Sequence, residues 1–148
     1  MISLVTRVLE ASVVVDQQTV GRIGRGLLAL CALQSDDTDT DLQWTCNKLS
    51  QMRVFRTEDG TRHFERDVVA AGGSILLVSN FTLAAATRKG RRPDFTGAMP
   101  PDRAVEVFAR FVERVRATGI PTETGRFGAD MTVHSINDGP STFILSSR

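Results

Sequence analysis

The sequence has few of the residues that most metal and nucleophilic sites require. Its 148 residues include only two cysteines, Cys31 and Cys46, and only two histidines, His63 and His134. The cysteines lie in apolar segments without CxxC spacing, which is typical of buried, reduced thiols. Two separated histidines and two such cysteines make a poor ligand set, so we expect no metal and no cofactor.

Long apolar runs and an excess of one charge are also missing. No stretch approaches the ~18 apolar residues that a membrane span requires. Residues 1–7 begin with strand-like alternation rather than a basic region followed by an apolar one, so a secretory signal is not expected. We expect a cytoplasmic protein with no membrane partner. The net charge of +1 indicates that any bound RNA is held by a local patch, and we expect no DNA partner.

Familiar catalytic motifs are absent as well. Residues 21–26 are rich in glycine, but the spacing is not GxGxxG and no helix follows, which favours a hairpin corner over a nucleotide loop. The P-loop, HExxH and GxSxG motifs do not occur. Ser79, His134 and Asp130 are the residue types of a catalytic triad. Nothing in the sequence indicates that they meet, so we favour a packed or exposed ring for His134.

What remains is typical of one α/β domain, residues 1–148, with 41% apolar and 24% charged residues. Asn-Asp-Gly-Pro at 137–140 consists of turn formers and predicts a turn between the last two strands. Short apolar or alternating runs predict strands at 2–8, 12–15, 19–23, 27–33, 54–55, 74–81, 130–136 and 142–145.

Two segments have the helical period. One apolar face runs through residues 39–53 and another through residues 101–118. Pro101 suits the first position of the second helix, and Gly119 suits its end. Because strands outnumber helices, we expect a mixed, partly antiparallel sheet with two principal helices.

Two short segments carry the functional argument. Ser79-Asn80-Phe81-Thr82-Leu83 lies where a buried strand ends, and free N–H groups at a strand end can hold a developing oxyanion. Asn137-Asp138-Gly139-Pro140-Ser141-Thr142 is the second segment. On pattern alone, the first also fits a polar strand end and the second an ordinary turn.

Together these segments resemble the SQFTL and NxGPVT signatures of the D-aminoacyl-tRNA deacylase family, whose members are also called D-tyrosyl-tRNA(Tyr) deacylases. The resemblance covers essentially the whole chain. It implies a compact, barrel-like α/β domain that forms a homodimer and hydrolyses the ester bond of D-aminoacyl-tRNA. Further family-like segments are residues 6–13, 21–24, 72–74 and 124–131.

The resemblance also implies how D-amino acids are selected. Gly139 and Pro140 are joined by a cis peptide and reach into the pocket of the partner subunit. Their carbonyl groups contact a D-aminoacyl moiety and leave no room for an L side chain. Glycine is achiral, so mischarged glycyl-tRNA is an additional expected substrate. Arg7 matches an arginine that holds this motif, which argues against the branch with a trans peptide.

The first signature forms the side of the substrate pocket opposite Gly139 and Pro140. The resemblance implies that the backbone N–H groups of Phe81 and Thr82 polarise the ester carbonyl. The 2′-hydroxyl of the terminal adenosine helps to activate the attack, and Thr82 as a nucleophile ranks second. The other expected substrate-binding residues are Ser79, Asn80, Leu83, Met131, Asn137 and Thr142.

The chain departs from the signatures at Asn80, where the family has glutamine, and at Ser141, where it has valine. The shorter amide alters side-chain contacts, but we expect the backbone donors beside it to be unaffected. Alternatives are an impaired tRNA-binding paralogue, a deacylase with shifted substrate choice, and an esterase or amidase acting on free D-aminoacyl compounds.

A basic loop follows the first signature closely. It fits either a solvated surface loop or a contact with acceptor-stem phosphates, and its position beside the pocket favours the phosphates. Its cations are Arg88, Lys89, Arg91 and Arg92.

Overall fold

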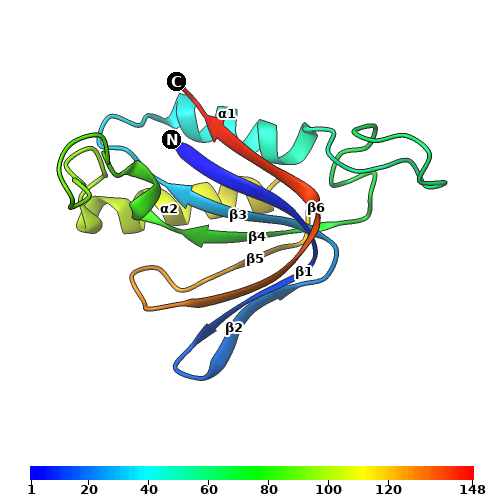
Figure 1. Cartoon of the computed structure of the whole chain (residues 1–148), viewed down its shortest axis with the longest axis horizontal. Coiled ribbons are helices and arrows are strands. Elements are labelled where there is room, and N and C mark those ends of the chain that lie inside the picture. The colour runs from blue at the N-terminus through cyan, green and yellow to red at the C-terminus, as the bar shows by residue number, and fades with distance from the viewer.

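A computed structural model describes all 148 residues, and six strands form one strongly curved, nearly barrel-shaped sheet (Figure 1). The strand order is β2-β1-β3-β4-β5, and β6 pairs with β1. Strand β1 is antiparallel to β2, β3 and β6, whereas β4 is parallel to both β3 and β5. The prediction of a mixed, partly antiparallel sheet is confirmed. The bounds are β1 Ile2–Val15, β2 Gln18–Ile23, β3 Gly26–Ala32, β4 Ser74–Ser79, β5 Thr122–Thr124 and β6 Thr132–Ser146.

Both principal helices, α1 (Asp39–Gln51) and α2 (Pro101–Arg116), pack against the sheet, and a short 3-10 helix, η1 (Phe81–Ala84), follows β4. The main core lies between helices and strands, where Leu49 and Phe111 belong to the same cluster as Leu77. A smaller core fills the other side of the curved sheet. No helix is both long and apolar enough to cross a membrane.

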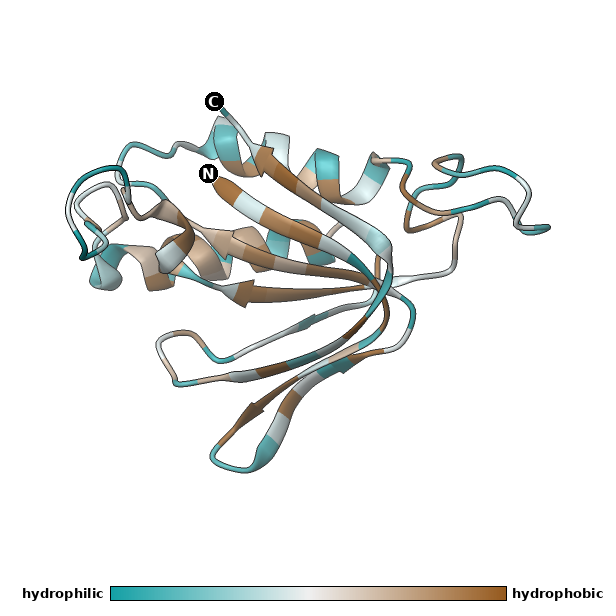
Figure 2. Cartoon of the chain, in the orientation of Figure 1, coloured by the Kyte–Doolittle hydropathy of each residue, from teal (hydrophilic) through white to brown (hydrophobic).

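Strand β4 contributes to both cores. Ile75 and Leu77 lie in the main core, and Leu76 and Val78 lie in the smaller one. Burial on both faces explains the uninterrupted apolar run, which is the darkest brown strand of the sheet in Figure 2.

The predicted turn at residues 137–140 is wrong, because β6 continues through it. From Thr6 to Val8, β1 advances two residues, while its partners in β6 run five residues, from Thr142 to Asn137. The extra residues of β6 form an irregular bulge, which pushes Asp138 to Pro140 out of the ladder. The turn formers mark a break in pairing rather than a reversal of the chain.

Two smaller predictions also need correction, and one strand was missed. Residues 54–55 do not form a strand, since Phe55 only makes an isolated bridge with Arg66. Strand β4 ends at Ser79, and Phe81 belongs to η1. Strand β5 has only three residues, which is too short for an alternation to be recognised.

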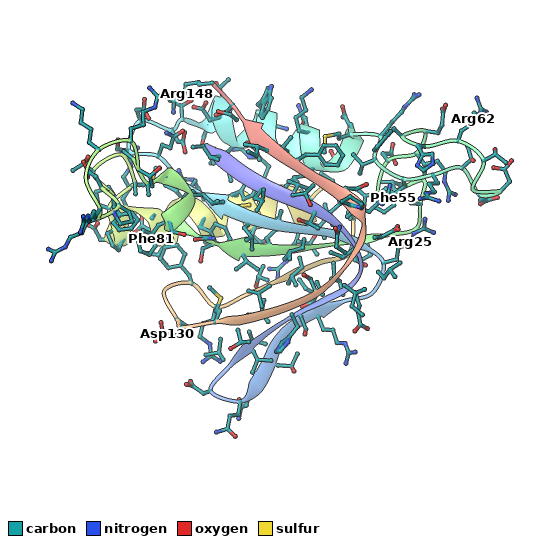
Figure 3. The ribbon with its side chains drawn as sticks, in the orientation of Figure 1. Arg25, Phe55, Arg62, Phe81, Asp130 and Arg148 are labelled. Atoms are coloured by element: carbon teal, nitrogen blue, oxygen red, sulfur yellow. The ribbon has the colours of Figure 1, made fainter.

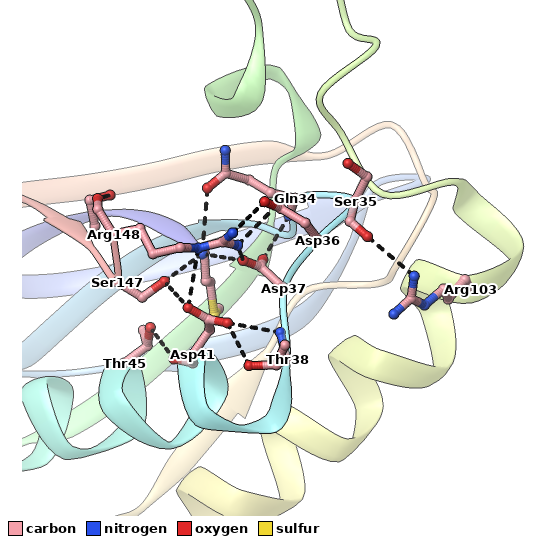
Figure 4. Close-up of polar contacts among 12 residues, drawn as sticks. Gln34, Ser35, Asp36, Asp37, Thr38, Asp41, Thr45, Arg103, Ser147 and Arg148 are labelled. Atoms are coloured by element: carbon pink, nitrogen blue, oxygen red, sulfur yellow. Dashed lines mark hydrogen bonds and ion pairs between the residues drawn. The ribbon is translucent and has the colours of Figure 1, made fainter.

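The two ends of the chain meet at the start of α1 (Figure 4). The buried N-terminal ammonium group pairs with Asp37 and donates to the Ser147 hydroxyl at 2.7 Å. The Arg148 guanidinium also donates to Asp37, at 2.7 Å. Hydrogen bonds from the Thr38 backbone, the Ser147 hydroxyl and the Thr38 hydroxyl hold the pKa of Asp41 well below its usual range. These contacts fix β1 and β6, the two longest strands, to one helix.

Candidate active site

A cavity of about 860 Å³ opens at the carboxyl end of β4. Its walls are the ends of β3 and β4, helix η1, the start of α2 and the loop 127–131. Its size fits a small-molecule or nucleotide site. Five of the residues that the sequence singles out line it together: Ser79, Asn80, Phe81, Thr82 and Met131.

Helix η1 turns the chain away from the sheet at this point. The Asn80 N–H donates to the carbonyl of Cys31 at 2.7 Å, which is the last bond between the two parallel strands. The Asn80 side-chain oxygen then caps η1, accepting the Thr82 N–H at 3.3 Å and the Thr82 hydroxyl. The Phe81 N–H has no acceptor within the protein, so it is free for a ligand.

The expectation that Asn80 leaves the neighbouring backbone donors unaffected is therefore wrong. Its short side chain reaches its own turn, as asparagine commonly does, and occupies the Thr82 N–H. The Thr82 hydroxyl donates to an amide oxygen, which is not a base that can accept its proton at neutral pH. Of the two predicted donors, the Phe81 N–H is the open one.

Aromatic rings stand on two sides of the cavity. Phe81, 58% exposed, meets Phe95 edge-on with the ring centroids 5.1 Å apart. Phe127 packs against Phe108 with the ring centroids 5.9 Å apart. Phe95 is not among the residues predicted from the sequence, although an aromatic residue directly after a basic loop is a signal for a nucleic-acid surface.

Few titratable groups line the cavity. Asp130 is its only carboxylate, and Figure 3 shows it at the same end of the molecule as Phe81. Burial raises the pKa of the Cys31 thiol to about 12, so this thiol is neutral near pH 7. His134 lies on β6 opposite Ser12, exposed, with no hydrogen bond to Ser79 or Asp130. The structure does not assemble the triad.

The second signature lies elsewhere and is held by Arg7, which is 2% exposed. Its Nε donates to the carbonyl of Asp138 at 2.9 Å and lies 3.1 Å from the carboxylate of the same residue. Its Nη1 donates to the carbonyl of Val54. The Asn137 amide closes the contact from the other side, donating to the carbonyl of Arg7 at 2.9 Å.

The peptide bond between Gly139 and Pro140 is cis, as the resemblance implies. A Cβ atom at Gly139 would lie only 2.0 Å from the backbone nitrogen of Ser141. No side chain fits there, so the sequence requires glycine. The motif is exposed on the surface of β6.

Within one chain the two signatures are far apart. Ser79 pairs with Cys31, Cys31 with Ser3, and Ser3 lies four residues before Arg7 on β1. Followed along the curved sheet, the path is about 14 Å across the strands from β4 to β6 and about 13 Å along them, or on the order of 19 Å in all. The structure therefore does not bring Asn137, Gly139, Pro140 or Thr142 to the cavity of their own chain.

The remaining predicted residues surround these two places. Leu83 is half-buried in η1 and does not line the cavity. Thr142 faces Thr6 across the ladder, with the hydroxyl oxygens 3.3 Å apart. Arg88, Lys89, Arg91 and Arg92 are all exposed in the loop after η1.

Comparison with known proteins identifies the family. Residues 4–146 match the family model described as D-Tyr-tRNA(Tyr) deacylase. A D-aminoacyl-tRNA deacylase of Geobacter sulfurreducens is 49% identical over 148 residues, covering 100% of this chain and 96% of its own. A D-aminoacyl-tRNA deacylase of Thermotoga petrophila is 46% identical over 147 residues, and the match covers 99% of this chain and 97% of the relative.

Two solved structures share the fold. One, named c-Myc DNA Unwinding Element Binding Protein, has a TM-score of 0.94 and 38% identity, covering 100% of this chain and 99% of its own. The other, described as a probable eukaryotic D-amino acid tRNA deacylase, has a TM-score of 0.83 at 18% identity, covering 97% of each chain, and supports the fold alone. On the full-length match and the identity to its relatives, the chain belongs to the D-Tyr-tRNA(Tyr) deacylase family.

Proposed function

We propose that this chain hydrolyses the ester bond of D-aminoacyl-tRNA. Water adds to the ester carbonyl, the bond to the ribose oxygen breaks, and the D-amino acid and tRNA leave. One observation carries the proposal: in a chain that matches the family throughout, Phe81 lines a cavity of about 860 Å³ and its backbone N–H has no acceptor within the protein. A fixed backbone donor stabilises the oxyanion that forms when the carbonyl is attacked.

In this proposal the RNA itself assists the attack. The Thr82 hydroxyl has no base beside it, and no histidine lines the cavity. An unactivated hydroxyl is a weak nucleophile. The 2′-hydroxyl of the terminal adenosine is next to the ester in the substrate itself, and orientation of bound groups supplies much of a rate enhancement.

Selection against L-amino acids is assigned to Gly139 and Pro140 of a second subunit. Neither residue lines the cavity of its own chain, and a path of about 19 Å along the sheet separates the two signatures, which supports this assignment. Strand β6 is an edge strand of 15 residues with three exposed apolar side chains: Val133, Ile136 and Ile144. Such an edge favours pairing with a second copy in a two-fold dimer, which makes both sites equivalent.

Glycyl-tRNA is included among the proposed substrates, because exclusion of a side chain cannot reject an amino acid that has none. A second candidate is an impaired or substrate-shifted member, which the Asn80 contact with the Thr82 N–H favours. These candidates differ in turnover rather than in fold.

The chemical test uses D-, L- and glycyl-tRNA, each with a normal or a 2′-deoxy terminal adenosine. Rapid cleavage of D-aminoacyl-tRNA, no cleavage of the L form and slow cleavage of the deoxy form are expected. Thr82→Ala should retain substantial activity. Loss of nearly all activity in Thr82→Ala, with the deoxy substrate cleaved normally, would restore Thr82 as the nucleophile. Binding without turnover would identify the impaired alternative.

The assembly test uses Ile136→Lys, with Val105→Lys on α2 as the control for an added charge at an exposed apolar site. Light scattering should give a dimer for wild type and control, and an inactive monomer for Ile136→Lys. An active monomer would exclude the cross-subunit site. A DNA hairpin serves as competitor, because the name of one related structure refers to DNA. Equal inhibition by DNA and uncharged tRNA would contradict a specific RNA site.

A further inference from the structure

Beside the cavity, residues 86–94 form a closed hairpin. The Ala86 N–H donates to the carbonyl of Asp94 at 2.8 Å, and the Asp94 N–H returns a bond to Ala86 at 3.0 Å. The Asp94 carboxylate accepts the Thr96 N–H at 2.9 Å, and this bond lowers the pKa of Asp94. The base of the hairpin is therefore fixed next to η1, at the end of the sheet where Figure 3 labels Phe81.

The hairpin carries concentrated, unneutralised positive charge. Arg88, Lys89, Arg91 and Arg92 are exposed, and none forms an ion pair, whereas arginines elsewhere, such as Arg22 and Arg114, do. Half of the seven-residue loop 87–93 spans at most about 12 Å when extended. The backbone of all four residues thus lies within about 12 Å of the hairpin base beside η1. Figure 2 shows the outer part of this loop as hydrophilic.

Phe95 follows the hairpin directly and joins it to the cavity. Its side chain lines the cavity wall, 38% of the residue is exposed, and its ring meets Phe81 at an interplanar angle of 64°. The pair leaves ring surface open to solvent instead of burying it in either core. Exposed aromatic surface beside unpaired cations is the combination that binds single-stranded nucleic acid, because bases stack on rings while cations hold the backbone.

We infer that Phe95 is a stacking residue for the unpaired nucleotide that precedes the terminal adenosine, and that the hairpin cations bind the phosphates on either side. The inference rests on the proposed function and adds a second nucleotide subsite to it. An unpaired base fits better than a duplex, since a ring can stack only on a base that has left its own stack. The cavity then holds the esterified adenosine, and the hairpin holds the strand leading to it.

The test compares one D-amino acid esterified to full tRNA, to the 3′-terminal trinucleotide and to adenosine alone. Phe95→Leu keeps the apolar volume and removes the ring, and Phe95→Trp restores a ring. For Phe95→Leu, kcat/KM should fall about tenfold more on tRNA and trinucleotide than on the adenosine ester. Phe95→Trp should recover most of that difference. Binding of uncharged tRNA should weaken by a similar factor.

The cations are tested by Arg91→Ala/Arg92→Ala against Arg22→Ala/Lys48→Ala, which removes equal charge from β2 and α1. The hairpin double variant should bind tRNA more weakly. The slope of log affinity against log salt concentration should become shallower by about 1.4, because each lost phosphate contact on a single strand contributes ~0.7. The control should do neither.

Three results separate the possible failures. Equal loss on all three substrates would make Phe95 a wall of the adenosine pocket and overturn the inference. No loss on any substrate, with unchanged tRNA binding, would also overturn it. If the wild-type protein cleaves none of the three esters, the proposed function fails, and the inference fails with it.

Discussion

Replacing Arg7 by methionine tests how the second signature is held. The change removes a charge that is 2% exposed, together with its bonds to the carbonyls of Asp138 and Val54. It also leaves the Asp138 carboxylate, 26% exposed, without its partner at 3.1 Å. Breaking a buried ion pair costs about 3–5 kcal/mol. Since Asp138 is partly solvated, we expect about 3 kcal/mol.

The measurement is urea unfolding of Arg7→Met, with thermal unfolding beside it. In a domain of this size, about 3 kcal/mol lowers the midpoint by roughly 6–12 °C. Asp138→Asn should cost less, because the backbone carbonyl of residue 138 still accepts from Arg7. The matched control is Arg22→Met, whose ion pair with Glu10 spans 3.6 Å between side chains 69% and 51% exposed. Exposed pairs of this kind contribute about 0–1 kcal/mol.

A loss below about 1 kcal/mol in Arg7→Met would refute this reasoning. It would mean that the bulge of β6 holds its own shape and that Arg7 is not its anchor. If Arg22→Met lowered the free energy of unfolding as much as Arg7→Met, removal of any arginine from this sheet would be costly, and the loss would not be specific to Arg7.

Three further outcomes are expected. Asn80→Gln should change kcat/KM by less than about tenfold, or 1.4 kcal/mol, because the proposed oxyanion donor is the Phe81 N–H, which the Asn80 amide does not bind; a larger gain would identify an impaired member. The depressed pKa of Asp41 contributes stability above pH ~4, the unfolded value, and this is lost at lower pH, so the difference in midpoint between wild type and Asp41→Asn should shrink there. Burial raises the pKa of Cys31 and Cys46, so the native protein should resist thiol alkylation at pH 8.5, whereas both thiols of the unfolded protein should be alkylated. Rapid labelling of the native protein would contradict this.

Much of the fold could be predicted because burial leaves a period in the sequence. Helix α2 begins at Pro101 as predicted, and its apolar stripe faces the main core. Strand β4 was recognisable because both of its faces are covered. Strand β6 was predicted only as two separate strands, 130–136 and 142–145, because the turn formers between them hide its continuity.

The site was predictable in its residues and less so in its arrangement. Ser79, Phe81 and Met131 meet at one cavity. The residues 137–140 correctly marked a departure from regular pairing, but local turn chemistry cannot tell a bulge from a reversal, since long-range pairing with β1 decides it. The capping contact of Asn80 was missed because it depends on where the strand ends.

The groups proposed to touch the aminoacyl ester are backbone groups: the Phe81 N–H and the carbonyls of Gly139-Pro140. A side-chain substitution can change such groups only by moving them. Residues that fix the backbone, such as Arg7, should therefore matter more for turnover than a hydroxyl that lines the cavity, such as Thr82. Asn80 departs from the signature but leaves the Phe81 N–H open. In this chain the Asn80 amide oxygen caps η1 from within its own turn.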